Sequence, residues 1–386
     1  MIAVRVSKRG ADRLLSGHLW VFASELEDPG QAQGGDAVQV LDPRGRSLGV
    51  AHYSSASQIS LRILSRQVRP VNRDFFRERL RAALRYRDRV VKDTEAYRLV
   101  HGEGDLLPAL IVDRYGDYLV MQNLNQGMDR AKSDIVAVLQ ELMAPRGILE
   151  RNDAAVRNKE QLPLRVGTLA GETPERVWFE MNGLRFVADL AHGQKTGAFL
   201  DQRENYLAAA TYACGRVLDC FTSGGGFALH LAARAESVEA VDSSGLALEL
   251  AEEARKINGI ANVEFRQADV FDLLTGYAAA GRRFSMVVLD PPAFARSRGA
   301  LEGAARGYKE INLRALKLLE PGGVLVTCSC SQHLSEAMLL EIVAAAALDA
   351  GRFVRVLERR AQARDHPILL TVPETHYLKC LILEAL

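Results

Sequence analysis

The chain has 386 residues, and this length predicts two or three domains. A hydrophobic fraction of 48% and a charged fraction of 25% are typical of a soluble globular protein, and no apolar run reaches membrane-spanning length. No export signal begins the sequence, and its five cysteines form no CxxC pair. We therefore expect a cytoplasmic protein with reduced thiols, no membrane segment and no metal site.

The net charge of +1 conceals an uneven distribution. The segment from residue 62 to residue 98 holds twelve basic and five acidic residues. Five of its arginines recur every four residues, at Arg73, Arg77, Arg81, Arg85 and Arg89. This spacing places them in one stripe along a helix. The stripe is either a solvated helix face or a ridge that contacts nucleic-acid phosphates, and the pattern leaves both readings open.

Residues 1–68 alternate apolar and polar positions between Gly- and Pro-containing turns, which predicts a small β-rich domain with one helix near Arg9–Leu15. Residues 69–190 mix helical and strand patterns and predict a middle α+β domain that contains the basic helix. This domain ends in a hairpin over Val177–Leu190, because Asn182–Gly183 favours a tight primed turn. Residues 191–386 form the third expected domain.

Within the third domain, strand and helix patterns alternate regularly from Val217 onward. This alternation predicts the α/β class, with a doubly wound sheet covered by helices on both faces. The expected strands are 216–220, 237–242, 263–269, 284–290, 323–328, 354–358 and 377–383.

The stretch Phe284–Phe294 is a buried strand that ends in an acid, two prolines and an aromatic residue. Pro291 and Pro292 cannot donate ladder hydrogen bonds, so the chain must leave the sheet there. Asp290 and Phe294 are therefore expected at the carboxyl edge of the sheet, where open α/β folds bind ligands.

A second candidate site follows the strand that ends at Cys220. The next turn is rich in glycine and leads into a helix, so a ligand can approach the backbone closely, although the spacing does not match a GxGxxG dinucleotide fingerprint. At later strand ends, Asp242 can accept from ribose hydroxyls and Asp269 can meet an adenine amino group, unless each only caps a helix. The candidate cofactor residues here are Asp219, Phe221, Gly225, Gly226, Asp242 and Asp269, and the set resembles the S-adenosylmethionine pocket of a class I methyltransferase.

A further buried strand ends at Cys328–Ser329–Cys330, and in a class I sheet it neighbours the Asp290 strand. A thiol at this edge points to nucleophilic catalysis. Strand parity cannot separate Cys328 from Cys330, because residues two apart face the same way. The other three cysteines, Cys214, Cys220 and Cys380, are expected in the core.

A thiol and an acid beside a methyl donor predict methylation at C5 of cytosine. The thiolate adds to C6 and turns the poorly nucleophilic ring into an enamine-like species that can accept a methyl group at C5. Asp290 is expected to hydrogen-bond the N3/N4 edge of the base, and Phe294 to stack on it once the base has left its helix.

Several motifs along the chain carry a family resemblance. They are Ser16–Phe22, Leu48–Tyr53, Lys195–Gly197, Phe199–Arg203, Gly225–Phe227, Asp290–Phe294, Gly307–Asn312, Ser329–Ser331 and Asp365–Pro367. Together they resemble the RlmI family of bacterial large-subunit (23S) ribosomal RNA cytosine-C5 methyltransferases over essentially the whole chain. The first two resemble the RNA-binding PUA domain of that family, whereas the glycine turn departs from its pattern.

This resemblance implies S-adenosylmethionine as cofactor and 23S ribosomal RNA as partner; a homodimer is compatible with it. It favours Cys330 over Cys328 as the nucleophile, acting with Asp290. It also implies roles at the cleft: Gln202 and Arg203 with the cofactor, and Lys195, Pro291, Pro292 and Phe294 with the RNA.

Three alternatives remain open at this point. The nearest keeps the cofactor and methylates a guanine nitrogen in ribosomal RNA, with the cysteines incidental. The second is a non-catalytic RNA-binding assembly factor that has lost cofactor affinity. The third, an NAD-dependent oxidoreductase, is disfavoured by the glycine spacing.

Overall fold

The computed structural model describes residues 1–193, 196–294 and 298–386. The chain divides into two compact units. Unit 1 comprises residues 1–177, 189–197 and 364–375, and unit 2 comprises residues 178–188, 198–363 and 376–386. No helix in the described part of the chain is both long and apolar enough to cross a membrane. The division into three domains at residues 68 and 190 stays a prediction.

Unit 1 begins with a six-stranded sheet in the order β2-β6-β5-β4-β1-β3. Alternate residues of β1 and β4 are buried, and they form one face of an apolar core with α1. The elements are β1 (Ala3–Val6), α1 (Lys8–Leu15), β2 (Trp20–Phe22), β3 (Leu26–Asp28), β4 (Ala37–Leu41), β5 (Ser47–Tyr53) and β6 (Ile59–Ser65).

The second sheet of unit 1 has five strands in the order β11-β10-β9-β8-β7. Two of its helices, α2 and α4, pack on this sheet through a core that includes Phe75, Phe76 and Leu139. The elements are α2 (Arg73–Val90), β7 (Ala96–His101), β8 (Leu110–Tyr115), β9 (Tyr118–Asn123), α3 (Gln126–Arg130), α4 (Lys132–Met143), β10 (Gly147–Asn152), α5 (Val156–Lys159) and β11 (Arg165–Gly171).

A two-stranded hairpin follows, formed by β12 (Arg176–Met181) and β13 (Leu184–Asp189). Asn182 and Gly183 join the strands with φ angles of 54° and 78°. Positive φ at both turn residues is what a primed turn requires, so the predicted hairpin is confirmed.

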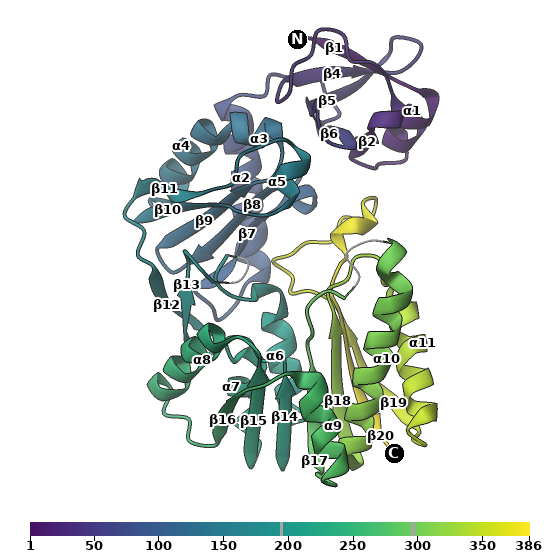
Figure 1. The fold of residues 1–386 in the computed structure, drawn as a ribbon. Helices are drawn as coiled ribbons and strands as arrows, with labels where there is room; N and C mark the ends of the chain where they lie inside the picture. The colour runs from purple at the N-terminus through teal and green to yellow at the C-terminus, as the bar shows by residue number, and fades with distance from the viewer. Residues whose placement is uncertain (194–195, 295–297) are drawn as a thin grey trace. The chain divides into compact units, whose positions relative to one another are not determined.

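Unit 2 is built on a seven-stranded sheet in the order β16-β15-β14-β17-β18-β20-β19. Strands β14 to β18 are mutually parallel, and β20 runs antiparallel to both of its neighbours. Figure 1 shows helices on both faces of this sheet, as predicted. The strands are β14 (Arg216–Cys220), β15 (Ser237–Asp242), β16 (Val263–Gln267), β17 (Phe284–Leu289), β18 (Leu319–Ser329), β19 (Val354–Arg360) and β20 (Lys379–Ala385).

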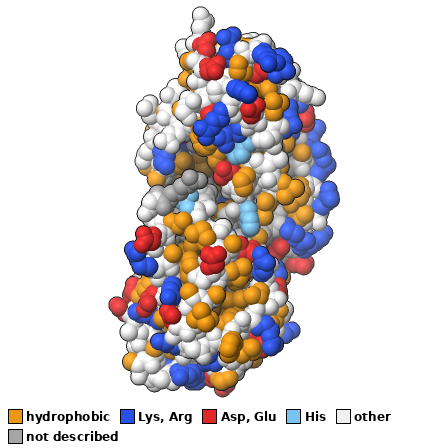
Figure 2. Space-filling view, turned by 90° about the vertical axis from the view of Figure 1, so that its right-hand side faces the viewer, with side chains coloured by type: hydrophobic (Ala, Val, Ile, Leu, Met, Phe, Trp, Pro, Cys, Tyr) orange, Lys and Arg blue, Asp and Glu red, His pale blue; other side chains and the backbone are white. Residues whose placement is uncertain are grey.

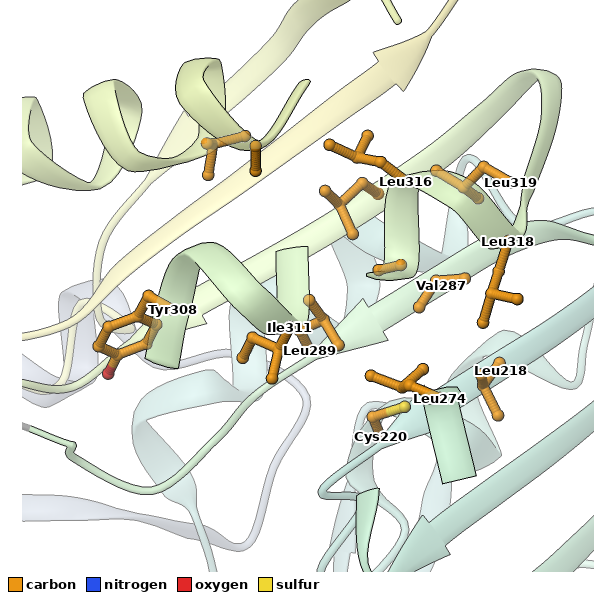
Figure 3. Packing of buried hydrophobic residues seen from close by; sticks show 14 of the residues in the cluster. Leu218, Cys220, Leu274, Val287, Leu289, Tyr308, Ile311, Leu316, Leu318 and Leu319 are labelled. Carbon is orange, nitrogen blue, oxygen red and sulfur yellow. The ribbon is translucent and has the colours of Figure 1, made fainter. Parts of the chain in front are cut away.

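The helices of unit 2 alternate with these strands along the chain. They are α6 (Arg203–Ala210), α7 (Gly226–Leu231), α8 (Gly245–Ile257), α9 (Val270–Ala279), α10 (Leu301–Leu318) and α11 (Glu336–Asp349). Figure 3 shows the apolar core between the sheet and α10, where Val287 and Leu289 of β17 lie near Ile311. The strand order reverses between β14 and β17, and the carboxyl ends of strands at such a reversal are where open α/β sheets bind ligands.

One surface of unit 2 is unusually apolar. Figure 2 shows hydrophobic side chains gathered on the face that α10 and α11 cover. Leu348 on α11 is 78% exposed, and Phe353, just before β19, is 82% exposed. Apolar patches of this kind often mark interaction surfaces, but the homodimer stays a prediction.

Candidate active site

Three predicted carboxylates meet at the carboxyl edge of the unit 2 sheet. Asp219 lies in β14, Asp242 ends β15, and Asp290 follows β17. Burial raises the pKa of Asp219 to about 7, and the negative charges of Asp290 and Asp242 contribute to that rise. The carboxylates are therefore close enough to repel one another, which favours a cationic ligand between them.

Asp219 organises the turn that follows its strand. Its Oδ2 accepts hydrogen bonds from Thr222 Oγ1 at 2.6 Å and from the Ala228 amide at 3.0 Å. Its Oδ1 is buried and has no hydrogen-bond partner among the described residues. A buried oxygen of this kind is costly unless a ligand satisfies it, so the site fits a group with hydrogen-bond donors.

The turn itself has a strained backbone. Phe221 and Ser223 adopt φ angles of 64° and 50°, and Gly225 adopts 79°. Non-glycine residues rarely adopt such angles, and they occur most often where a backbone must meet a ligand. Gly226 is required for a different reason: a Cβ at this position would lie 2.4 Å from the ring of Tyr206. The sequence indicated the glycines but not the strain at the two other residues.

Asp242 and Asp269 both hold backbone amides. Asp242 accepts from Ser223 at Oδ2 and from Ser244 at Oδ1, each at 2.9 Å, and so ties the glycine turn to the end of β15. Asp269 caps α9, and its Oδ1 accepts from the amides of Phe271 and Asp272. The helix-cap reading therefore holds for Asp269, and its contact with an adenine group stays a prediction.

Gln202 and Arg203 are buried where a short 3-10 turn leads into α6. Gln202 accepts a hydrogen bond from Asn205 Nδ2 at 2.6 Å, and its amide lowers the pKa of Cys328. Arg203 lies within 3.7 Å of Glu204 and holds Asn182 through its backbone carbonyl. Lys195, the third residue of this predicted set, lies outside the described residues.

Beyond β17 the chain leaves the sheet as predicted. Pro291 is buried and Pro292 is exposed. The Phe294 ring is partly buried and lies 4.7 Å from the ring of Tyr308 on α10, measured between centroids. A Cβ at Gly307 would touch the same ring at 3.3 Å. Phe294 thus packs against α10 on one side, and its stacking on a base stays a prediction.

The structure distinguishes Cys328 from Cys330, which strand parity could not do. β18 ends at Ser329, so alternation no longer applies to Cys330. Cys328 is fully buried opposite Cys380, and burial together with the Cys380 thiol raises the pKa of Cys328 well above its ordinary value. Cys330 is half-buried beyond the end of the strand. A thiol that must reach a substrate is therefore better placed at Cys330.

The other three cysteines were all predicted to be buried, and two of them are. Cys220 and Cys380 are buried core residues, and Figure 3 shows Cys220 packed near Leu218 and Leu274. The prediction that Cys214 is a core residue was wrong, because Cys214 is exposed just before β14. Its neighbour Ala213 is the buried residue of that turn.

Comparison with known proteins places the chain in a family. Residues 142–375 match the S-adenosylmethionine-dependent methyltransferase family, and residues 4–66 match the PUA-like domain family. A protein of Tolumonas auensis named ribosomal RNA large subunit methyltransferase I is 42% identical over 99% of both chains. A protein of the same name from Aeromonas hydrophila is 44% identical over 96% of both. The chain belongs to the ribosomal RNA large subunit methyltransferase I family.

Solved structures agree on the fold of this family member. One, described as a methyltransferase complexed with S-adenosylhomocysteine, is 21% identical and covers 100% of both chains with a TM-score of 0.86. Another, from Streptococcus mutans, is also 21% identical over 100% of both chains, with a TM-score of 0.85. The predicted fold class and the cofactor S-adenosylmethionine are thereby confirmed.

Two residues close to Cys330 in the structure were not among the site residues predicted from the sequence. Tyr308 on α10 accepts a hydrogen bond from Ser329 Oγ at 2.9 Å and lies 3.2 Å from Ser331 Oγ, so it fixes both neighbours of Cys330. Lys379 is buried at the start of β20. The signal for Lys379 was present, because a lysine interrupts an otherwise apolar strand pattern there, and buried lysines are rare.

The arginine stripe lies on α2 in unit 1. Its arginines fall into two groups, those that form ion pairs with α4 and those that do not. Arg73 pairs with Asp134, and Arg77 and Arg81 pair with Glu141, so acids of α4 already engage these three. Arg85 and Arg89 are exposed, and no carboxylate of the described chain lies within ion-pair distance of either. The solvated-face reading is favoured for the first part of the stripe only.

Replacing Arg85 and Arg89 with Glu should weaken RNA binding and reduce the slope of log affinity against log salt by about two, because each arginine is expected to contact one phosphate. Affinities measured across a salt series would test this expectation. Replacing Arg77 with Glu is the matched control, and its main effect should be on stability through Glu141. An unchanged salt slope in the double variant would make the whole stripe a solvated face.

Proposed function

We propose that the protein transfers a methyl group to C5 of a cytosine in large-subunit ribosomal RNA through a covalent adduct with Cys330. The name of the relatives supports large-subunit ribosomal RNA as the substrate, since the 42% identity extends over 99% of both chains. The position of Cys330 supports the chemistry: it is half-buried at the ligand-binding edge of the sheet, whereas Cys328 is fully buried. That contrast is the observation on which the proposal rests.

The covalent step overcomes the weak nucleophilicity of cytosine C5. The Cys330 thiolate forms an Sγ–C6 bond, and the electrons of the C5–C6 double bond become available at C5. S-adenosylmethionine, held at the ends of β14 and β15, would supply an electrophilic methyl group for C5, and its sulfonium would become a neutral thioether. A base then removes the C5 proton, the double bond re-forms, and the Sγ–C6 bond breaks to release the thiolate.

Residues of this chain fit the cofactor at the ends of β14 and β15. The unsatisfied Oδ1 of Asp219 would accept from a donor group of the cofactor. The glycine turn would meet it with backbone amides, held in place by Asp242. Gln202 and Arg203 are proposed to close the site from the start of α6.

Asp290 and its neighbours are proposed to hold the target base. Asp290 follows β17, the strand next to β18, and its negative charge raises the pKa of Cys328. It is therefore near the end of the strand that carries the thiols, where it can accept from the cytosine N4 amino group. Pro291, Pro292 and Phe294 would form the wall of the base pocket, and Lys195 would contact the RNA backbone.

The N-terminal part is proposed to bind RNA as well. Residues 4–66 match the PUA-like domain family, which supports the first of the three proposed domains, residues 1–68. Residues 69–190 and 191–386 would follow as the middle domain and the methyltransferase domain. In this proposal, one domain binds the RNA and another carries out the methyl transfer.

The product decides between the proposal and its alternatives. Ribosomal RNA from cells that lack the protein is incubated with the purified chain and S-adenosylmethionine carrying a labelled methyl group, and the nucleosides are analysed by mass spectrometry. Label in 5-methylcytidine is the expected result. Label in a methylguanosine would support the rival reaction, and absence of any label together with failure to bind S-adenosylhomocysteine would support an assembly factor.

A further inference from the structure

Lys379 is a buried cation for which the described part of unit 2 supplies no carboxylate partner. It lies opposite Ser329 on the neighbouring strand, and only 2% of it is exposed. Its Nζ donates to the carbonyl oxygens of Ser331 and Tyr377, at 2.7 Å each. These bonds use two of the three ammonium donors and bring no negative charge. A buried ammonium group is costly without a counter-ion, so a nearby anion would stabilise the charged form of Lys379.

The candidate anion is Cys330, the residue before Ser331, whose carbonyl oxygen accepts from Lys379. Burial lowers the pKa of Lys379 to about 8, and the negative charge of Cys330 is the one ionic influence that opposes this fall. From α10, the hydroxyl of Tyr308 lies within hydrogen-bond distance of Ser329 Oγ and Ser331 Oγ; burial raises the pKa of Tyr308, and Cys330 contributes to the rise. From beyond β17, Asp290 acts on the neighbouring thiol Cys328.

The backbone around Cys330 is held firmly. The side chain of Ser329 donates to Tyr308, Ser331 Oγ lies within hydrogen-bond distance of the same hydroxyl, and the Ser331 carbonyl accepts from Lys379. The residues on both sides of Cys330 are therefore held by the ammonium group of Lys379 on β20 and the phenol of Tyr308 on α10. Such preorganisation is what a reactive nucleophile needs.

We propose that Lys379 is a positioning residue that holds Cys330 as a thiolate by forming an ion pair with its Sγ. This inference rests on the proposed function in that it assigns the charge state of the proposed nucleophile. In the reaction, the ammonium group stabilises the thiolate before it adds to C6 and again when the Sγ–C6 bond breaks. Lys379 keeps its proton throughout.

Alkylation of the cysteines tests the pair without substrate or cofactor. The whole chain is treated with iodoacetamide across a pH series, and the Cys330 and Cys214 peptides are quantified by mass spectrometry. Cys214 is exposed and serves as a reference thiol in the same molecule. In the unmodified protein, Cys330 should reach half-modification at a lower pH than Cys214; the reverse order would overturn the proposal.

Variants at position 379 test whether Lys379 lowers the pH at which Cys330 is modified. In Lys379→Met the half-modification pH of Cys330 should rise by about one unit or more, equivalent to about a tenfold slower alkylation at neutral pH, while Cys214 is unchanged. Lys379→Arg keeps the charge and should restore most of the difference. S-adenosylhomocysteine binding verifies that each variant is folded, and Lys379→Gln replaces Lys379→Met if the latter is not. An unchanged Cys330 profile in a folded neutral variant would overturn the pair.

The alkylation result for Lys379 can be told apart from the result for the proposed methyl transfer. If Cys330→Ala leaves methyl transfer intact, the covalent mechanism fails even though the alkylation profile still reports the ion pair. If the alkylation profile does not depend on Lys379 while Cys330→Ala is inactive, the mechanism stands and the role of Lys379 fails.

Discussion

Replacing Cys330 with Ala is expected to lower the rate of methyl transfer to ribosomal RNA by about a thousandfold or more, because the proposed covalent route to C5 depends on this thiol. Cys330 is the half-buried thiol at the ligand-binding edge, and its loss leaves the core unchanged. Single-turnover transfer of labelled methyl groups measures the effect. Binding of S-adenosylhomocysteine should be unaltered, since the cofactor residues lie on other strands.

Cys328→Ala is the matched control. Cys328 is fully buried against Cys380, so its truncation should cost stability of about 1 kcal/mol and change the transfer rate by less than about tenfold. RNA that carries 5-fluorocytidine adds a direct test, because fluorine at C5 cannot be removed as a proton. It should trap an adduct with the unaltered protein and with Cys328→Ala. A trapped adduct on Cys330→Ala would contradict the assignment.

The second large effect is expected at Asp219. In Asp219→Asn the affinity for S-adenosylhomocysteine should fall by about ten- to a hundredfold, since a hydrogen bond to a charged group contributes about 1.5–3 kcal/mol. The same change weakens the bonds that Thr222 and Ala228 donate to Oδ2, so the glycine turn is also less well held. Calorimetric titration measures the affinity. Asp269→Asn, at the cap of α9, is the control and should change it by much less.

The raised pKa of Asp219 also predicts how the stability of the protein changes with pH. Burial raises its pKa from 3.8 to about 7, so the folded chain binds this proton more tightly than the unfolded chain. The resulting stability is complete below pH 3.8 and is lost as the pH rises through about 7. The cofactor-free protein should therefore lose stability relative to Asp219→Asn over this range, as denaturant unfolding would show. Parallel curves for the two proteins would contradict the raised pKa.

Cofactor affinity should move in the opposite direction. A ligand that carries an ammonium group favours the ionised form of Asp219, so its affinity should rise as the pH passes about 7. Asp219→Asn should remove this rise. Proton release on binding, measured in buffers of different ionisation enthalpy, checks the same linkage.

Much of unit 2 could be predicted from the sequence. Strands β14 and β15 begin and end where expected, because apolar runs bounded by polar residues have little freedom in a buried parallel sheet. β17 ends at Leu289, one residue before the expected boundary, where the prolines terminate the ladder. The carboxylates after these strands then meet at one edge, because parallel strands share the direction of their carboxyl ends.

The sequence by itself determined the fold class, the cofactor edge and the thiol-bearing segment, since these depend on patterns within single strands and on the direction in which parallel strands run. Only the tertiary structure showed that Cys328 is fully buried while Cys330 is half-buried, that Cys214 is exposed, that Arg77 pairs with Glu141, and that Lys379 donates to the Ser331 carbonyl next to Cys330. Those outcomes depend on where β18 ends and on which side chains a neighbouring strand or helix brings near. Such contacts join residues far apart in the chain, so a local pattern can flag an unusual residue such as Lys379 but cannot name its partner.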